Sequence, residues 1–306
     1  MILTYKCRLL PSKKQHAALA DICESQRQLY NAALQERMDC YRKTGKSLTC
    51  FDQYKELTEC RNDCGLVEMA DLPVAVQRWT LKRLDDAYKA FFRRLKARNG
   101  KAGFPRFRGK GQWDSFGFSE FSGIRFDGKR LRFKGLPSGL RVHLHRLLPD
   151  DADIRSCVFR RDGRGWAVCF QVVVATPEKR TVKHAVGIDL GLKVFAYCSD
   201  GLVIPNPLLI LRAEREMRRR QRALARCQRG SNRRRKVKAM LARTHADIVN
   251  TRTTWLHQQS ALLTKHNDLI AVEDLNVKGM LKHPTLARSI ADASWSKFLG
   301  FLSYKA

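Results

Sequence analysis

The sequence has few acidic residues for its length. Its 306 residues hold 59 lysines and arginines against 29 aspartates and glutamates, so the formal net charge at pH 7 is +30. Charge of one sign at this level must be screened or must bind a polyanion, and nucleic acid is the first candidate. The hydrophobic content of 44% is that of an ordinary globular chain, with room for one large domain or two to three small ones.

Long apolar runs and paired cysteines are also missing. No segment approaches the roughly 18 apolar residues that a membrane-spanning helix needs, and no secretory signal opens the sequence, so we expect no membrane partner. The ten cysteines are scattered and form no C-x-x-C pair. Cys157, Cys169 and Cys198 lie in apolar, strand-like runs, which favours buried, reduced thiols in a cytosolic protein. Cys60 and Cys64 have a C-x-x-x-C spacing but no second pair that would complete a zinc site.

A single carboxylate stands inside the apolar stretch 185–199 (AVGIDLGLKVFAYCS). Alternating apolar residues precede Gly191, and a second apolar run follows it and ends at turn residues 199–201. This pattern predicts a β-hairpin with Asp189 near the end of its first strand. An ionised carboxylate buried there is costly unless it is paired, hydrogen-bonded or bound to a metal, so we expect a functional role or a specific partner.

A second strand with an acidic end lies downstream, in residues 268–274 (DLIAVED). A long helical segment separates it from the hairpin, and such a path can make the two strands parallel neighbours. Asp189 and Glu273 would then point into one crevice at the carboxyl ends of adjacent strands. Clustered carboxylates offer hard oxygen ligands to Mg²⁺ or Mn²⁺, and two such ions about 3.5–4 Å apart are the usual arrangement for attack on a phosphodiester.

Two other interpretations of the segment GIDLG stay open at this point. It can be a buried strand whose acid bonds to a neighbouring backbone N–H, because short motifs have many chance matches. Sugar kinases and actin-like ATPases also place a similar segment under ATP phosphates. The sequence shows no second Gly-rich phosphate loop, and its basic charge favours nucleic acid over this ATPase interpretation.

The beginning of the chain predicts a strand followed by helices. Residues 1–10 alternate as a strand, and Ser12 with Gln15 forms a capping-box signal for a helix that we expect to end near Gly45. A second helix is predicted over 73–100, and its aromatic residues fit a core better than a base-stacking platform.

Short strands punctuated by turn residues follow over 115–175 and predict a small antiparallel barrel or sandwich. Residues 155–161 and 166–174 form a predicted hairpin within it, and the strand 1–10 can join the same sheet. His143 and His145 alternate on one strand face, and we interpret this pair as structural.

Two segments concentrate the positive charge. Residues 93–110 contain eight basic residues and no acid, together with Phe104 and Phe107, a mixture that suits phosphate contact and stacking on unpaired bases. Residues 212–243 contain fourteen lysines and arginines against two acids, in two predicted helices separated near 230–232. Contact with several phosphates predicts strongly salt-dependent binding. The second of these helices keeps an apolar face made of Val237, Leu241, Ile248, Trp255 and Leu262.

A family resemblance rests on the order and spacing of six segments. They are residues 25–34 (SQRQLYNAAL), 84–92 (LDDAYKAFF), 103–108 (GFPRFR), 186–193 (VGIDLGLK), 271–280 (AVEDLNVKGM) and 289–306 (SIADASWSKFLGFLSYKA). Together they resemble TnpB, the RNA-guided DNA endonuclease family encoded by bacterial insertion sequences and related to the type V CRISPR nucleases. Older descriptions call these proteins probable transposases.

The resemblance implies an α+β multidomain fold. Its parts are a wedge-type β-barrel of residues 1–10 and 104–180, a helical recognition lobe of residues 11–103 inserted into that barrel, and a RuvC-like (RNase H-like) α/β nuclease domain. The nuclease domain takes residues 181–306, includes the basic helices 208–265 and lacks its C-terminal part.

The resemblance also implies the activity and the partners. Asp189 and Glu273 match the first and second catalytic, metal-binding acids of a DNA endonuclease that depends on Mg²⁺ or Mn²⁺. The implied partners are a guide RNA from the element's own end and a double-stranded DNA target, in the cytoplasm and nucleoid of a prokaryote. We predict nucleic-acid contacts at Arg93, Arg94, Arg106, Arg108, Lys110, Arg218, Arg219, Arg233, Arg234 and Arg235.

One part of the family pattern is absent from this sequence. In the family, a four-cysteine zinc ribbon and a third catalytic aspartate follow the Tyr-Lys-Ala segment, so we expect zinc only in that missing ribbon. Asp274 should point to the strand face opposite Glu273, and Asp292 precedes the missing position. We therefore expect a truncated reading frame, a fragment or a decayed copy that cuts weakly or not at all.

Two further functions stay open as alternatives. One is a nuclease-deficient, RNA-guided DNA-binding protein that acts by occupancy as a repressor does. The other is a sequence-tolerant RNA-binding protein that needs no DNA target. Target binding that survives removal of both acids would favour the first, and equal affinity for unrelated RNAs would favour the second.

Overall fold

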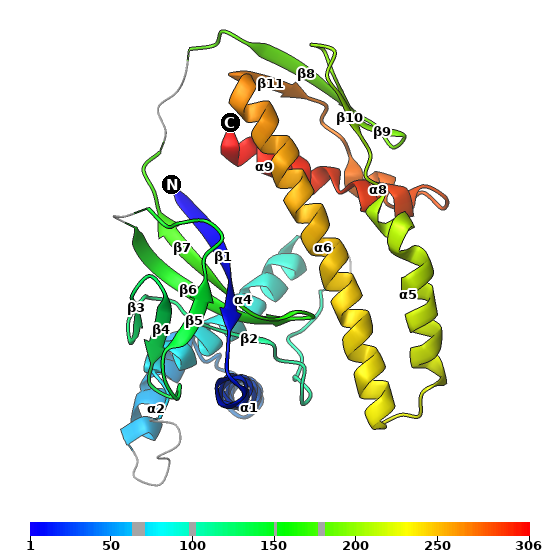
Figure 1. The fold of residues 1–306 in the computed structure, drawn as a ribbon. Helices are drawn as coiled ribbons and strands as arrows, with labels where there is room; N and C mark the ends of the chain where they lie inside the picture. The colour runs from blue at the N-terminus through cyan, green and yellow to red at the C-terminus, as the bar shows by residue number, and fades with distance from the viewer. Residues whose placement is uncertain (63–70, 98–101, 150–151, 177–180) are drawn as a thin grey trace. The chain divides into compact units, whose positions relative to one another are not determined.

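Two hydrophobic cores organise the chain, one in each of two compact units, unit 1 (Met1–Thr176) and unit 2 (Pro177–Ala306). Both units mix helices with a sheet in this computed structural model, as Figure 1 shows. The division falls just before residue 181, the predicted start of the nuclease domain. The structure describes residues 1–62, 71–97, 102–149, 152–176 and 181–306.

A seven-stranded antiparallel sheet forms the centre of unit 1. Strand β1 lies in the middle and pairs with β7 on one side and β5 on the other. Tyr5, Cys7 and Leu9 point into the core, as the predicted alternation requires. The sheet order is β2 (Ser115–Phe118), β6 (Asp153–Asp162), β7 (Gly165–Val173), β1 (Ile2–Leu10), β5 (Leu140–His143), β4 (Arg130–Phe133) and β3 (Ile124–Phe126).

This sheet is a half-barrel. The rings of Phe116 on β2 and Phe133 on β4 have centroids 6.2 Å apart, so strands distant in the sheet order curl toward each other. The pairings between described strands leave β2 and β3 as its two edges, and the predicted closure into a wedge-type barrel stays a prediction. The hairpin of β6 and β7 is confirmed, with Gly165 at a φ of 120° that favours glycine in its turn.

Three helices are described in unit 1, and α1 and α4 contact the edge strand β2 of this sheet. Helix α1 begins after Ser12, whose hydroxyl accepts from the N–H of Gln15 while the Gln15 side chain accepts from the N–H of Ser12, so the predicted capping box is confirmed. The helix ends at Gly45, which adopts a left-handed conformation. The predicted helix end at Gly100 lies outside the described residues. The bounds are α1 (Lys13–Thr44), α2 (Cys50–Asn62) and α4 (Val74–Lys96).

Helices and strands of unit 1 share one core. Leu19 and Leu34 of α1 and Leu84 of α4 are fully buried in the same cluster as Phe116 and Phe159 of the sheet. The helical segment therefore packs on the sheet in place of forming a core of its own. The subdivision into a barrel and a separate recognition lobe remains a prediction.

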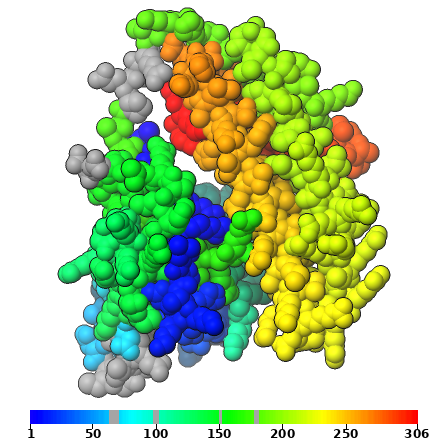
Figure 2. Space-filling view, in the orientation of Figure 1, coloured from blue at the N-terminus to red at the C-terminus, as the bar shows by residue number. Residues whose placement is uncertain are grey.

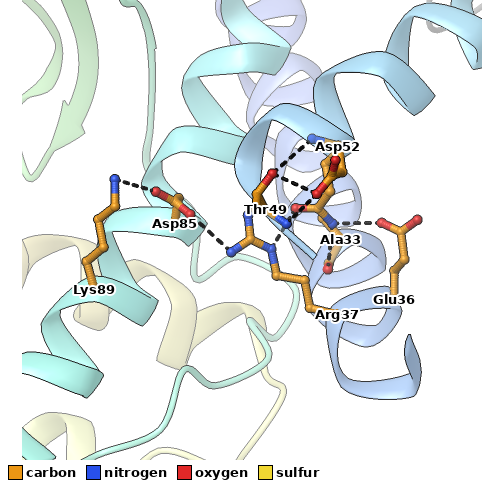
Figure 3. Close-up of polar contacts among 8 residues, drawn as sticks. Ala33, Glu36, Arg37, Thr49, Asp52, Asp85 and Lys89 are labelled. Carbon is orange, nitrogen blue, oxygen red and sulfur yellow. Dashed lines mark hydrogen bonds and ion pairs between the residues drawn. The ribbon is translucent and has the colours of Figure 1, made fainter. Parts of the chain in front are cut away.

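A buried arginine joins the three helices (Figure 3). Arg37 of α1 donates from Nε to Oε1 of Gln53 on α2 at 2.8 Å, and from Nη1 to Oδ1 of Asp85 on α4 at 3.2 Å. Gln53 in turn donates to the carbonyl of Ala33 and to the carboxylate of Glu36. Because Arg37 is only 7% exposed, removing one of these partners would leave a buried charge without compensation.

A four-stranded sheet forms the centre of unit 2. Its order is β10-β9-β8-β11, with β8 and β11 parallel and the other pairs antiparallel. Figure 1 shows the helices α6 and α9 on one side of this sheet. The strands are β8 (Ala185–Leu190), β9 (Val194–Cys198), β10 (Val203–Pro205) and β11 (Leu269–Val272), and the helices are α5 (Leu209–Arg226), α6 (Asn232–His266), α7 (Val277–Met280), α8 (Ala287–Ala293) and α9 (Trp295–Lys305).

The apolar face of α6 agrees with the prediction at Trp255, which packs edge-on against Phe195, and differs from it at Leu262. Leu262 is 42% exposed, whereas Leu256, Ser260 and Leu263 are buried against the sheet and α9. Helix α6 starts at the predicted turn, where the hydroxyl of Ser231 caps the N–H of Arg234. The difference arises because a one-residue shift around a helix rotates the buried face by about 100°.

A carboxyl pair between α1 and α2 makes the stability of unit 1 depend on pH. The hydrogen bond that protonated Glu56 donates to the carboxylate of Glu36, together with burial, raises the pKa of Glu56 from 4.5 to about 7. A raised carboxyl pKa means that the folded state binds the proton more tightly, so this contribution is full below pH 4.5 and is lost as the pH rises to about 7.

We expect Glu56→Gln to flatten this part of the stability profile and to gain stability relative to the parent chain as the pH rises from about 5 to about 8. Urea unfolding at several pH values measures the effect. Asp21→Asn, at an exposed position of α1 that does not act on Glu56, is the control. Parallel profiles for Glu56→Gln and the parent chain would contradict the shared proton.

Candidate active site

Two carboxylates lie at the ends of two parallel neighbouring strands. The pairing of β8 with β11 runs in register up to Ile188 and Val272. Asp189 is the next residue of β8, and Glu273 directly follows β11. Because in-register neighbours point to the same face of a sheet, the two side chains share the face opposite Ile188. The prediction of parallel neighbouring strands is confirmed.

The two carboxylates line a single shallow hollow on this face. Its walls come from three strands, and Tyr197 of β9, the cross-strand partner of Asp189, is 50% exposed beside them. The N–H of Gly187 donates to the hydroxyl of Ser199 at 3.0 Å, which fixes the floor. The lining residues are Gly187, Ile188, Asp189, Tyr197, Cys198, Ser199, Ala271, Val272 and Glu273.

The burial argument for Asp189 was wrong. Asp189 and Glu273 are both exposed, because no described element covers this face of the unit 2 sheet. Neither carboxylate accepts a hydrogen bond from a described residue, so the interpretation that a neighbouring backbone N–H satisfies Asp189 is wrong as well. Both acids keep their oxygen lone pairs available for a cation or for water.

The donor set fits a hard divalent cation in part. Carboxylate oxygens are the ligands that Mg²⁺ and Mn²⁺ prefer, and water commonly completes their coordination. Across the described ranges, no group of three or more acidic, histidine or cysteine side chains stands ready to hold a metal ion. Asp274 is exposed, lies beyond the end of β11, and is not among the residues that line the hollow.

Asp292 has a structural position away from these carboxylates. It is 9% exposed, and both of its oxygens accept from the N–H of Ile210 in the first turn of α5, at 3.2 and 3.0 Å. Arg252 of α6 donates to it at 3.2 Å. This carboxylate therefore joins α5, α6 and α8. Its negative charge also stabilises α5, because it lies at the positive, N-terminal end of the helix dipole.

The basic helices of unit 2 present part of their predicted contacts and use another part internally. Arg218 and Arg219 lie on an exposed arginine-rich face of α5 together with Arg215, Arg222 and Arg226. Arg218 also pairs with Glu214, and Arg219 lies 3.8 Å from Glu216. Figure 2 shows the side chains of the α5–α6 hairpin standing outward, in yellow-green and yellow.

Arg234, one of the predicted contacts, also has a structural role. Its guanidinium donates to the carbonyls of Leu224 and Cys227 at 2.7 and 3.1 Å, so it satisfies the last turn of α5. Arg233 and Arg235, its neighbours in the sequence, are exposed and make no ion pair within the described residues. A basic run in a sequence does not reveal which of its members closes a helix end.

The basic loop of unit 1 is held by its backbone. The Asn31 amide of α1 forms two hydrogen bonds with the main chain of Arg108, accepting from its N–H at 2.8 Å and donating to its carbonyl at 3.0 Å. Arg27 donates to the same carbonyl at 2.8 Å. Phe104 packs edge-on against Tyr88 and Phe91, whose ring centroids lie 5.4 and 5.2 Å away. The loop is thus fixed although it has no regular structure.

The predicted contacts in and before this loop are exposed. Arg93 and Arg94 lie in the last turn of α4, and Arg94 donates to the carbonyl of Gly103 at 3.4 Å. Phe107 is 48% exposed and has no aromatic neighbour in the described part of the chain. Of the two loop aromatics, Phe104 serves as an anchor and Phe107 is free to stack. The exposed cations here are Arg93, Arg94, Arg106, Arg108 and Lys110.

The cysteines form no chemical site in the described chain. Cys157 and Cys198 are buried and Cys169 is half-buried, close to the prediction, and all described cysteines are free thiols. Burial raises the pKa of Cys7 to about 11 and that of Cys23 to about 12, so both thiols stay protonated and inert near pH 7. The predicted C-x-x-x-C pair cannot be judged, since Cys64 lies outside the described residues.

Comparisons with known proteins agree with these features. Residues 167–283 match the OrfB_IS605 family model, described as "Probable transposase", and residues 1–46 match its "Helix-turn-helix domain" model. A "Putative RNA-guided DNA endonuclease" of Streptomyces pristinaespiralis is 28% identical over 305 residues, which cover 98% of this chain and 74% of that protein. InsQ of Escherichia coli (strain K12), with the same description, is 26% identical over 318 residues, which cover 98% of this chain and 77% of that protein.

A solved structure shares the fold. Cas12f1, in the cryo-EM structure of its complex with sgRNA and target DNA, matches with a TM-score of 0.50 over 97% of this chain and 72% of its own. At 10% identity this likeness shows a shared fold and nothing further. Two segments of the chain, residues 1–46 and 167–283, thus match models of the OrfB_IS605 family, and almost the whole chain is similar to relatives described as putative RNA-guided DNA endonucleases.

Two further observations concern the helices of the chain. Residues 1–46 form the strand β1 and the single long helix α1, so the segment that matches a helix-turn-helix model contains one uninterrupted helix here. Within the described residues, no helix combines the length and the apolar character needed to cross a membrane.

The bonds that Asp292 makes to α5 and to Arg252 predict that its replacement strongly lowers stability. Asp292→Ala would leave Arg252 buried without its carboxylate and α5 without its cap, and we expect a loss of about 3–5 kcal/mol in the free energy of unfolding of unit 2. Thermal or urea unfolding measures it. Asp274→Asn, at an exposed position, should cost little, and a similar loss in both variants would contradict this role of Asp292.

The clamp made by Asn31 predicts a local effect. Asn31→Ala should release the loop around Arg108, so trypsin should cut after Arg106 and Arg108 faster while the melting temperature changes little, because the local opening free energy falls. Gln35→Ala, an exposed change on the same helix, is the control. Unchanged cleavage at these two arginines would show that the loop is held by other contacts.

Proposed function

We propose that the chain is an RNA-guided DNA-binding protein with a metal-dependent nuclease site at Asp189 and Glu273. One observation carries the proposal: both carboxylates stand at the ends of parallel neighbouring strands, on one open face, with no protein partner among the described residues. Relatives that align with 98% of this chain are named RNA-guided DNA endonucleases, which supports the same activity.

The chemistry assigned to this site is phosphodiester hydrolysis. Asp189 and Glu273 would hold Mg²⁺ or Mn²⁺ through carboxylate oxygens, and the bound metal would supply an activated water and neutralise charge on the phosphate. The exposure of the hollow suits a polymer, because a strand of DNA can lie across an open face that would not enclose a small substrate. Tyr197, beside Asp189, offers an aromatic face to such a strand.

The proposed roles of the remaining parts follow the family. Residues 181–306 would form the RuvC-like nuclease domain, residues 1–10 and 104–180 the wedge-like barrel, and residues 11–103 the recognition lobe. The partners would be a guide RNA from the element's own end and a double-stranded DNA target. The exposed arginines of α5 and of the loop 102–110 supply the positive surface that phosphates require.

A nuclease-deficient RNA-guided binder is the second candidate. The observation that favours it is the donor set of two carboxylates, since the described residues bring no third ligand to them. In this case the chain would occupy its target without cutting, as a repressor does. The two candidates share the guide and the target, and they differ only in whether the carboxylates act.

Asp189→Asn and Glu273→Gln should each weaken Mn²⁺ binding and lower guided cleavage by roughly a hundredfold or more, because metal-mediated charge stabilisation is worth several kcal/mol. The protein would be copurified with its RNA and given matching duplex DNA with Mg²⁺, and Mn²⁺ binding would be followed by electron paramagnetic resonance. Asp274→Asn, one residue from Glu273 and outside the lining of the hollow, is the matched control.

Three outcomes separate the candidates. Cleavage that both acid variants lose and Asp274→Asn keeps would support the nuclease. Guide-dependent binding to DNA that all variants share, with no cleavage by any, would support the occupancy protein. Equal affinity for unrelated RNAs, with no guided DNA binding, would contradict both candidates and support a sequence-tolerant RNA-binding protein.

A further inference from the structure

Three arginines that belong to separate elements of unit 1 converge beside Trp113. Arg83 of α4 donates from Nη1 to the hydroxyl of Ser115 on β2 at 3.0 Å. Its guanidinium lies over two indole rings, 4.4 Å from the centroid of Trp113 and 5.4 Å from that of Trp79. These contacts fix the orientation of a long side chain that remains partly exposed at the surface.

The second arginine stands next to the first across the sheet. Ser115, which accepts from Arg83, is in register with Arg160 on β6. Cross-strand partners point to the same face with their Cβ atoms about 5 Å apart, so the exposed Arg160 side chain rises beside the Arg83 guanidinium. Helix α4 can approach this edge because residue 117 is glycine, where a Cβ would lie 2.7 Å from the Nε1 atom of Trp79.

The third arginine comes from the basic loop. The main chain of Arg108 is clamped by Asn31. Desolvation first, and then the positive charges of Arg108 and Arg160, lower the pKa of Arg83. Arg108 and Arg160 therefore each lie close enough to Arg83 for their charge to repel its guanidinium.

Asp114 and Glu24 pair with other arginines, and Asp86, three residues after Arg83 on α4, forms no ion pair with it. Asp114, adjacent to Trp113, pairs with Arg161 at 2.8 Å, and Glu24 pairs with Arg27 at 2.7 Å. Within the described ranges, no carboxylate forms an ion pair with any of the three arginines. Like charges held together by fixed contacts are unfavourable without a counter-ion, so the arrangement is suited to an anion.

We propose that Arg83, Arg108 and Arg160 form a binding site for a backbone phosphate of a nucleic-acid strand. Guanidinium groups bind phosphate oxygens through paired, charge-assisted hydrogen bonds, and several of them around one anion match its charge. The exposed ring of Phe107, next to Arg108, lies where the base of a bound nucleotide can stack, which favours a nucleic acid over a free phosphate ion. The site rests on the proposed nucleic-acid function and is independent of Asp189 and Glu273.

The test is the salt dependence of binding by the full chain. Fluorescein-labelled single-stranded RNA and duplex DNA of about 20 units are titrated by fluorescence anisotropy at several salt concentrations. Arg83→Gln and Arg160→Gln should each bind about tenfold more weakly at low salt. Each should also reduce the slope of log K against log salt by about 0.7 on RNA or about 0.9 on duplex DNA.

Two further variants make the result specific. Arg125→Gln removes an equal charge from β3, at the other end of the strand order, and should leave the slope unchanged. Arg83→Lys keeps the positive charge but loses the planar guanidinium group. The slope of log K against log salt should therefore remain close to that of the parent chain. Near-ultraviolet circular dichroism from the tryptophans, which Arg83 contacts, shows that each variant folds.

The outcomes distinguish this site from the proposed function. A reduced slope on the RNA arm would place the guide strand at the site, and a reduced slope on the DNA arm would place the target there. Slopes of Arg83→Gln and Arg160→Gln equal to that of Arg125→Gln, in folded variants, would overturn the site while leaving guided binding intact. Failure of the parent chain to bind either polymer would overturn the proposed function together with the site.

Discussion

The parallel pairing of β8 with β11 is the constraint on which the candidate site depends. These strands are separated by two long helices in the sequence, and the register that joins Ile188 to Val272 sets Glu273 beside Asp189. A shift of one residue would turn either acid to the covered face, where Val186 and Ile188 pack against α6 and α9. The hydrophobic face of β8 therefore fixes the register, and the register brings the two acids together.

Positive charge has two different uses in this protein. Some arginines stabilise the fold. Arg37 joins three helices, Arg234 donates to carbonyl groups at the end of α5, and Arg252 pairs with the buried Asp292. Others face solvent, on α5, where Glu214 and Glu216 pair with only some of them, and around Arg83 and Arg108, which form no ion pair within the described residues. The net charge of +30 thus includes arginines that hold the fold together and arginines on two surfaces that suit phosphates.

Rigidity links the surfaces of unit 1 to their proposed task. The basic loop has no helix or strand, yet Asn31 and the edge-on packing of Phe104 hold its main chain in place. A charged segment without such anchors would lose conformational entropy on binding, and the affinity would fall accordingly. Arg83 would likewise lose little conformational entropy on binding, because its stacking on Trp113 fixes its orientation before a ligand binds.

Local signals determined most of the elements. Alternation gave β1 and the hairpin of β6 and β7, the Ser12–Gln15 capping box and Gly45 set the ends of α1, and the acid-ended strands pointed to Asp189 and Glu273. These features depend on neighbours a few residues apart, so a sequence alone can reveal them.

Long-range packing decided the rest. Only the tertiary structure shows that Asp189 is exposed, that Arg234 closes a helix end, and that the face of α6 turns Leu262 outward. It also brings Arg83 and Arg160 together across α4, β2 and β6, which no spacing in the sequence predicts. The sequence by itself thus determined the types of residue and the elements that carry them. Which side chains meet was decided by the register of strands and the rotation of helices, because these are set by contacts between segments far apart in the chain.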